Sequence, residues 1–186
     1  HQPAQAELRL ILHTQEGRKR LLISAAGGDS RLHLTESQRE NPAKAPNFCM
    51  LLRKYIAGGR ILEIKQIGLE RVVRIEIEAK DEMGVPTAFA LVCEIMGKYS
   101  NILLLGREDR VMGAIRPISL DTSRVRPLAA GMRYELPPMD KHNPLEEDED
   151  CLARAIAAGA LPAGLVGGVQ GLAPGGGAGS PGRPPG

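Results

Sequence analysis

Two adjacent acid–base pairs are the residues whose types and spacing could bind an anion. Glu70-Arg71 follows Gly68-Leu69 between two probable strands, and Asp109-Arg110 lies in a second turn. A guanidinium can donate two parallel N–H groups to a phosphate or a base edge, while the neighbouring carboxylate orients it or accepts from a base amine. A solvated turn with a surface ion pair is the alternative, and local sequence physics favours it for both pairs.

Signatures of common enzymes are absent. The chain contains no GxSxG, Walker loop, HExxH or GxGxxG after a strand. Neither the histidines nor the cysteines have the spacing of metal ligands, and there is no CxxC. These residues are His1, His13, His33, His142, Cys49, Cys93 and Cys151. We therefore expect no enzymatic activity, metal or cofactor, and we expect buried, reduced thiols of a cytosolic protein at Cys49 and Cys93.

Composition and charge limit the class of protein. The 186 residues are 42% hydrophobic and 25% charged, which is typical of a globular domain. No apolar run approaches the ~18 residues of a membrane span, and aromatic residues, at 3%, are too few for a base-stacking platform. The net charge is +2, but residues 1–141 carry +5 because an acidic run occupies 146–150. That charge favours a polyanionic partner without demonstrating one.

The elements that must position these residues follow from hydrophobic periodicity. Apolar and polar residues alternate at a strand period in many short segments separated by turn residues. The predicted strands cover residues 6–13, 21–23, 32–34, 61–67, 72–77, 88–96, 102–105 and 111–115. We expect an α+β fold, an antiparallel β-sandwich-like domain with flanking helices.

Helical periodicity is found in two places. Asn47 can cap a helix that runs to Gly58, with a buried stripe containing Phe48, Leu51 and Leu52. Residues 144–158 can form a second helix with an acidic first turn. Beyond it, 15 of the 27 residues from 160 to 186 are Gly or Pro, so we expect a disordered tail.

Four ordered blocks within residues 1–141 resemble the NFACT N-terminal domain. The blocks are Asn41-Pro42 with Pro46-Asn47-Phe48-Cys49-Met50-Leu51-Leu52-Arg53-Lys54-Tyr55-Ile56 and Gly58-Gly59; Gly68-Leu69-Glu70-Arg71; Glu94-Ile95-Met96-Gly97-Lys98-Tyr99-Ser100-Asn101-Ile102; and Gly131-Met132-Arg133-Tyr134 leading to Pro137-Pro138 and Lys141. By this resemblance residues 1–141 form the NFACT N-terminal domain without its first segment. Residues 142–174 form a linker and the start of a helix-hairpin-helix region, and 175–186 form the Gly/Pro tail.

The resemblance implies a function in translation. The family is the bacterial ribosome-associated quality-control factor, formerly called fibronectin-binding protein A. Its members bind ribosomal RNA and a large ribosomal subunit obstructed by peptidyl-tRNA. They recruit alanine tRNA and support untemplated alanine tailing of the stalled chain, which marks it for proteolysis. Peptidyl transfer belongs to the ribosome, so the resemblance implies a cytoplasmic, ribosome-associated binding protein with no membrane partner.

The resemblance also assigns site residues. An Asp-Arg pair that the family needs for tRNA recruitment maps onto Glu70 and Arg71, with Glu one methylene longer than Asp, whereas Asp109-Arg110 is out of register. The same blocks make Arg53, Lys54, Lys98 and Asn101 candidate contacts to RNA phosphates, since Lys, Arg and Asn are common phosphate ligands. A solvated surface is the alternative for each, and we expect Tyr99 in the core rather than against a base.

Two other functions are considered. The domain is similar in fold to the first domain of formamidopyrimidine-type DNA glycosylases, which use an N-terminal proline followed by Glu. Pro3 does not match that pattern, so glycosylase activity is not expected. The former family name makes a fibronectin-binding surface adhesin the alternative function. The cysteine usage and the lack of a visible export signal argue against it.

Overall fold

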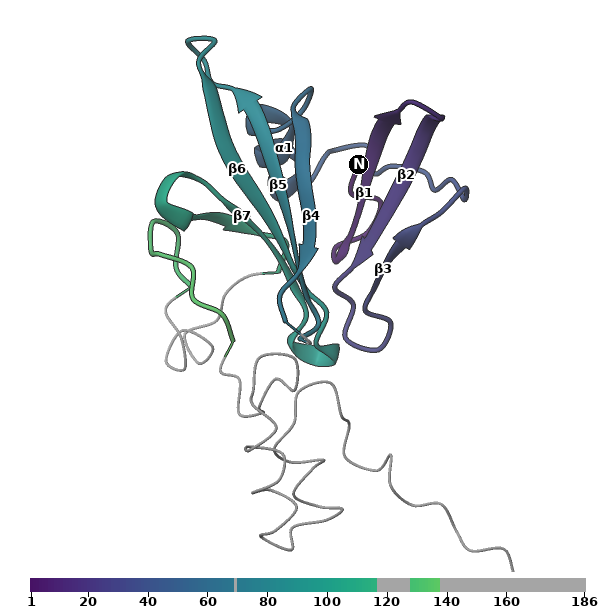
Figure 1. Cartoon of the computed structure of the whole chain (residues 1–186). Coiled ribbons are helices and arrows are strands. Elements are labelled where there is room, and N and C mark those ends of the chain that lie inside the picture. Colours follow the sequence, from purple (N-terminus) through teal and green to yellow (C-terminus); the bar gives the residue numbers. More distant parts are fainter. Residues whose placement is uncertain (69, 117–127, 138–186) are drawn as a thin grey trace, which may run out of the picture. The chain divides into compact units, whose positions relative to one another are not determined.

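The computed structural model describes residues 1–68, 70–116 and 128–137, and these form two antiparallel sheets and one α-helix (Figure 1). The first sheet has the order β1 (Glu7–Thr14), β2 (Gly17–Ser24), β3 (Arg31–Leu34). The second has the order β4 (Arg60–Gln66), β5 (Val72–Lys80), β6 (Pro86–Glu94), β7 (Asn101–Leu105), β8 (Val111–Ala114). The helix α1 (Asn47–Tyr55) joins the sheets, and short 3-10 turns occupy Gly97–Tyr99 and Arg107–Asp109.

The first sheet follows the alternation seen in the sequence. Leu8 and Leu10 lie opposite Ile23 and Leu21 of β2, and these four side chains face the hydrophobic core. Because side chains alternate across a strand, the residues between them, beginning with Arg9, face the other way. The strands predicted at 6–13 and 21–23 are confirmed, and the structure pairs them as an antiparallel hairpin with one face in the core.

The second sheet is buried on both faces at its centre. One apolar cluster is shared with the first sheet and α1; its buried members include Leu8, Ile23, Phe48, Leu52, Ile75, Leu91 and Leu104. A second cluster covers the opposite face and contains Val72, Ala90, Val92, Leu103, Leu105, Val111 and Leu128. Residues 102–105 are accordingly apolar without alternation, as expected for a strand with no solvent face. The edge strand β4 is mostly exposed.

The boundaries of α1 differ from the prediction. Pro46, in extended conformation, occupies the N-cap position, and its carbonyl accepts the N–H of Met50 at 3.1 Å. Asn47 is instead the first helical residue, so its predicted capping role is wrong. The helix ends at Tyr55 rather than Gly58, whose φ of +76° is left-handed. The next glycine is needed for space, because a Cβ on Gly59 would lie 2.9 Å from a main-chain oxygen of β5.

The chain divides into two compact units. One contains both sheets and the helix, His1–Ile67 with Arg71–Glu135; the other contains Gly68–Glu70 and Leu136–Gly186. The described residues are thus mostly β, with one helix where flanking helices were expected. The predicted helix at 144–158, the other segments beyond 141 and Cys151 lie outside the described residues, and the glycosylase-like fold stays a prediction. No helix in the described residues is long and apolar enough to cross a membrane.

Candidate functional site

Arg71 lies immediately before β5 and is exposed. Its carbonyl oxygen accepts the N–H of Ile95 at 2.8 Å, and the neighbouring carbonyl of Val72 accepts the N–H of Ile67 at 2.9 Å. Among the described residues its guanidinium makes no ion pair. The sheet therefore holds the main chain of Arg71 while its five N–H donors face solvent, which is the arrangement an external anion requires.

Glu70 and Arg71 are neighbours in sequence but belong to different compact units of the chain. Glu70 is half-buried and belongs to the unit that contains Gly68–Glu70, whereas Arg71 belongs to the sheet unit. Glu70 also makes an interaction of its own and is not a free carboxylate. A joint role for the two residues therefore stays a prediction that rests on the resemblance.

Lys98 and Asn101 lie at the same end of the second sheet as Arg71, where β6 ends and β7 begins. Oδ1 of Asn101 accepts the main-chain N–H of Arg116 at 3.1 Å and that of Ile102 at 2.9 Å. Its Nδ2 donates to the carbonyl oxygen of Arg116 at 3.4 Å. Both ends of this side chain therefore already join β7 to the residues after β8, and an RNA contact at Asn101 stays a prediction.

Tyr99 is on the surface, so its predicted place in the core is wrong. Its side chain is 69% exposed, because it lies in the short turn between β6 and β7. Nζ of Lys98 lies 4.9 Å from the centre of its ring, within the range of a cation–π contact. Lys98 and Tyr99 thus present a cation beside an aromatic ring to solvent.

Arg53 and Lys54 lie on the solvent side of α1, in its last turn. Nζ of Lys54 forms a 3.1 Å ion pair with Glu82, and the hydrogen bond to that carboxylate raises the pKa of Lys54. Arg53 lines a hollow of about 270 Å³ together with Arg9 and Ile11 of β1. The RNA-binding candidates predicted from sequence therefore do not all lie at one place. They are Arg53, Lys54, Arg71, Lys98 and Asn101.

The second acid–base pair has an internal role. Oδ1 of Asp109 lies 2.6 Å from Nη2 of Arg74, whose side chain is only 18% exposed. Arg110 donates to Glu108 at 3.3 Å and to the carbonyl oxygen of Gly131 at 2.9 Å. Both members of the pair bind other parts of this protein, whereas Arg71 has no ion pair among the described residues. Local sequence could not distinguish the two pairs in this way.

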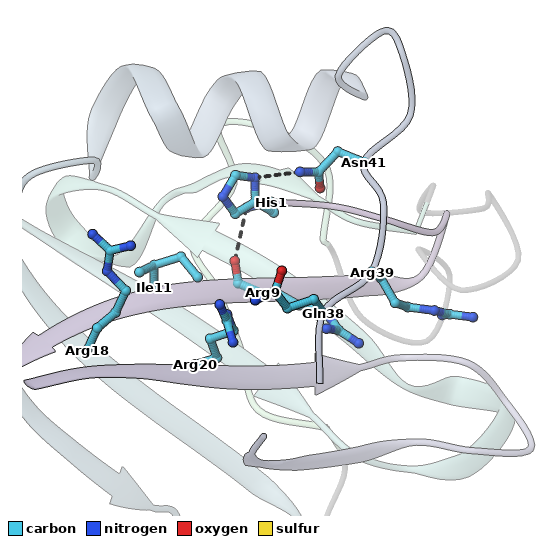
Figure 2. A pocket seen from close by; sticks show the side chains of 8 residues that line it. All are labelled: His1, Arg9, Ile11, Arg18, Arg20, Gln38, Arg39 and Asn41. Atoms are coloured by element: carbon cyan, nitrogen blue, oxygen red, sulfur yellow. Dashed lines mark hydrogen bonds between the residues drawn. The ribbon is translucent and has the colours of Figure 1, made fainter. Parts of the chain in front are cut away.

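The sequence analysis missed a cluster of four arginines on the first sheet: Arg9, Arg18, Arg20 and Arg39. They surround a hollow of about 200 Å³, which His1, Ile11, Gln38 and Asn41 also line (Figure 2). A signal was present, because Arg9 and Ile11 alternate with the core leucines of β1. On β2, Arg18 and Arg20 share one face and Lys19 lies on the other. The contribution of residues 38–41 could not be predicted from local sequence, because it depends on where the segment after β3 lies against the sheet.

The cysteines of the described residues are buried thiols, and the acidic residues and histidines are dispersed. In the ranges that the structure describes, no group of three His, Cys, Asp or Glu residues could hold a metal ion. Cys49 and Cys93 are both buried free thiols, as predicted. Burial, with a smaller contribution from Glu94, raises the pKa of Cys93 to about 12, so this thiol stays protonated and unreactive at neutral pH.

Known sequences match the chain over nearly its whole length. The family model described as NFACT N-terminal and middle domains matches residues 1–175. The chain is 36% identical over 178 residues to the Rqc2 homolog RqcH of Bacillus subtilis, covering 94% of this chain and 31% of that protein. It is 30% identical over 120 residues to ribosome quality control complex subunit 2 of Schizosaccharomyces pombe, covering 64% of this chain and 11% of that protein.

A solved structure has the same fold. It is the N-terminal part of the fibronectin/fibrinogen-binding protein from Streptococcus suis, with a TM-score of 0.83 and 33% sequence identity. The match covers 92% of this chain and 65% of the solved chain. The chain thus spans less than a third of the B. subtilis relative and about two thirds of this structure.

Proposed function

Because this chain belongs to the family of NFACT N-terminal and middle domains, whose relatives include ribosome quality-control proteins, we propose that it binds tRNA and an obstructed large ribosomal subunit. In this proposal it associates with ribosomal RNA and the peptidyl-tRNA that blocks the subunit, and it recruits alanine tRNA for C-terminal tailing of the stalled chain. It supplies binding and positioning and no catalytic group, since the ribosome performs peptidyl transfer.

The exposed guanidinium of Arg71 is the observation that carries this proposal. It lies at a strand junction whose main chain is hydrogen-bonded on both sides, and it has no ion pair within the described residues. The strand junction fixes the main chain of Arg71, and its unneutralised guanidinium can donate two parallel hydrogen bonds to a phosphate. Burial of Arg71 beneath apolar side chains would have prevented it from binding a phosphate, but the residue is exposed.

The test compares tRNA binding of two arginine variants of the full chain. Arg71→Ala should lower the tRNA that co-purifies by about tenfold, the loss expected for one charge-assisted contact of ~1.4 kcal/mol. Arg60→Ala is the matched control, because Arg60 is also exposed at the start of a strand and its nearest ion-pair oxygen, on Glu78, is 3.9 Å away. An equal loss in both variants, or no loss in either, would contradict the proposal.

Glu70 is tested by changing its length and its charge separately. Glu70→Asp restores the residue that the family resemblance assigns to this position, so tRNA binding should be retained or improved. Glu70→Gln keeps the length and removes the charge, so binding should fall if the carboxylate orients Arg71 or accepts from a base. Equal binding by both variants would leave Arg71 as the functional member and end the case for Glu70.

A second candidate function is binding to fibronectin or fibrinogen. It is supported by the S. suis protein, which is described as binding both and shares this fold at 33% identity. Immobilised fibronectin and fibrinogen should capture the full chain if this function is correct, and Arg71→Ala should not alter the capture. Capture of the chain by tRNA but not by either glycoprotein would exclude this candidate.

A further inference from the structure

The outer face of the first sheet carries arginines on neighbouring strands. In the antiparallel register Ile11 of β1 lies opposite Arg20 of β2, and His13 lies opposite Arg18. Residues directly opposite share a face of the sheet, so Arg18 and Arg20 stand on the same face as Arg9 and away from the hydrophobic core. Figure 2 shows Arg18 and Arg20 on one strand beside Ile11, with His1 across the hollow from them.

Two of the four arginines form ion pairs with the same carboxylate, which offsets one of their two positive charges. Glu7 accepts a 2.8 Å hydrogen bond from Nε of Arg9 and another of 2.8 Å from Nη1 of Arg39. The side chains of Arg9 and Glu7 are only 7% and 10% exposed, so this pair is shielded from water. Nη1 of Arg9 also donates to the carbonyl oxygen of Ser37 at 2.6 Å. Arg9 and Arg39 thus hold the segment after β3 against the sheet.

The other two arginines have no acidic partner among the residues that the structure describes. Nη1 of Arg20 donates to the main-chain oxygen of Glu36 at 3.0 Å, a neutral acceptor that leaves the guanidinium charge in place. Arg18 is exposed and has no ion pair among the described residues. Placing two cations on one strand without an anion between them is repulsive, and a bound anion would remove that repulsion.

The hollow has the size and lining for a phosphate group. About 200 Å³ is several times the ~30 Å³ that a water molecule occupies in the liquid, so a phosphate with some of its waters fits. Apart from Ile11 its lining side chains are polar or cationic, and Asn41 is held there by a 3.0 Å hydrogen bond to the ring of His1. Guanidinium groups two residues apart on one face of a strand can approach two phosphate oxygens together.

We infer that Arg18 and Arg20, above the buried Arg9, form a binding site for a backbone phosphate of RNA that is separate from Arg71. The neighbouring hollow contains Arg53, one of the cations predicted from sequence to touch RNA, and shares Arg9 and Ile11 with this one. That second hollow is lined mainly by apolar residues, so Arg53 lies near the first sheet without extending its group of arginines. The choice of RNA as ligand rests on the proposed function, whereas the anion site rests on the geometry of the first sheet.

The experiment measures the affinity of the full chain for tRNA as a function of salt concentration. The variant Arg18→Gln/Arg20→Gln removes the two charges without touching the Glu7–Arg9–Arg39 ion pairs that hold the fold. The control Arg60→Gln/Lys80→Gln removes the same charge from exposed positions in the second sheet. Circular dichroism and the urea midpoint verify that each variant folds like the unaltered chain.

The site predicts a specific change. Arg18→Gln/Arg20→Gln should lower tRNA affinity by about tenfold and reduce the slope of log K against log salt by roughly 1 to 2, because one or two fewer counterions are released. The control should leave the slope within about 0.5 of the unaltered value. Equal slopes for the variant and its control would overturn the site.

Comparison with the Arg71→Ala variant distinguishes failure of this site from failure of the proposed function. Loss of binding in Arg71→Ala with no change in Arg18→Gln/Arg20→Gln overturns this site and leaves the proposed function intact. Loss in Arg18→Gln/Arg20→Gln alone supports the site and contradicts the role given to Arg71. Inorganic pyrophosphate is the second probe. If Arg18 and Arg20 are required for pyrophosphate binding but not for tRNA binding, the ligand is a free phosphate and the assignment to RNA is wrong.

Discussion

The phenolic hydroxyl of Tyr134 donates a 2.7 Å hydrogen bond to Oε1 of Glu94, a residue that is 1% exposed at the end of β6. Tyr134 lies in the segment 128–137, which covers the outer face of the second sheet through Leu128. Glu94 pairs with Val72, the residue after Arg71. This hydrogen bond therefore attaches the covering segment to the sheet beside the strand junction that carries Arg71.

Tyr134→Phe should lower the free energy of unfolding by about 1.5–3 kcal/mol, because a buried carboxylate loses a hydrogen-bond donor. Urea denaturation measures the change. Tyr99→Phe is the control, since its hydroxyl belongs to a side chain that is 69% exposed, and its effect should stay within about 0.5 kcal/mol. Equal effects of the two substitutions would show that the hydrogen bond contributes nothing.

Arg116→Ala should weaken the connection between the sheets. Nη1 of Arg116 donates to the carbonyl oxygens of Lys98 at 2.8 Å and Ser100 at 3.1 Å, and lies 3.4 Å from that of Ala25, just beyond β2. Removing these contacts leaves partly buried acceptors unpaired, which costs about 1–3 kcal/mol in the free energy of unfolding. Arg107→Ala, at an exposed position, should change it by less than about 0.5 kcal/mol. A urea midpoint common to both variants would contradict this role.

Glu108→Gly should stabilise the protein. Glu108 has a φ of +56°, a left-handed conformation that favours glycine and strains other residues. Its 3.3 Å contact with Arg110 is largely exposed and contributes little. We expect a gain of up to about 1 kcal/mol in unfolding free energy, measured by thermal or urea unfolding. Glu40→Gly, at an exposed position without left-handed φ, should instead lower it by a similar amount, and a loss at both positions would refute the strain.

Stability should fall at alkaline pH because of Cys93. Burial raises its pKa from 9.0 to about 12 in the folded protein, so between those values the unfolded chain has released the thiol proton and the folded chain keeps it. The unfolded state then binds fewer protons, and stability decreases with rising pH by up to ~1.4 kcal/mol per pH unit. In reducing buffer, unfolding free energies at pH 8 and pH 10 should differ less for Cys93→Ala than for the unaltered chain. The same difference in both would contradict this cause.

Local sequence predicted the elements well because their signals are local. The alternation in β1 and β5 and the apolar stripe of α1 each lie within a few residues, and the structure has a strand or helix at each of these places. The end of α1 was less predictable. Its capping depends on the backbone conformation of Pro46, and its C-terminal limit depends on how closely Gly59 approaches the main chain of β5.

The sequence by itself determined the alternating strands, the net positive charge of residues 1–141 and, through four ordered blocks, the family. Only the tertiary structure decided which charges are free. Asp109 is engaged by Arg74, 35 positions away, and Arg39 is engaged by Glu7, 32 positions away, while Arg71, Arg18 and Arg20 keep their charge. Strand register and the path of the intervening loops bring such partners together, and neither is encoded in the few residues around any one charge.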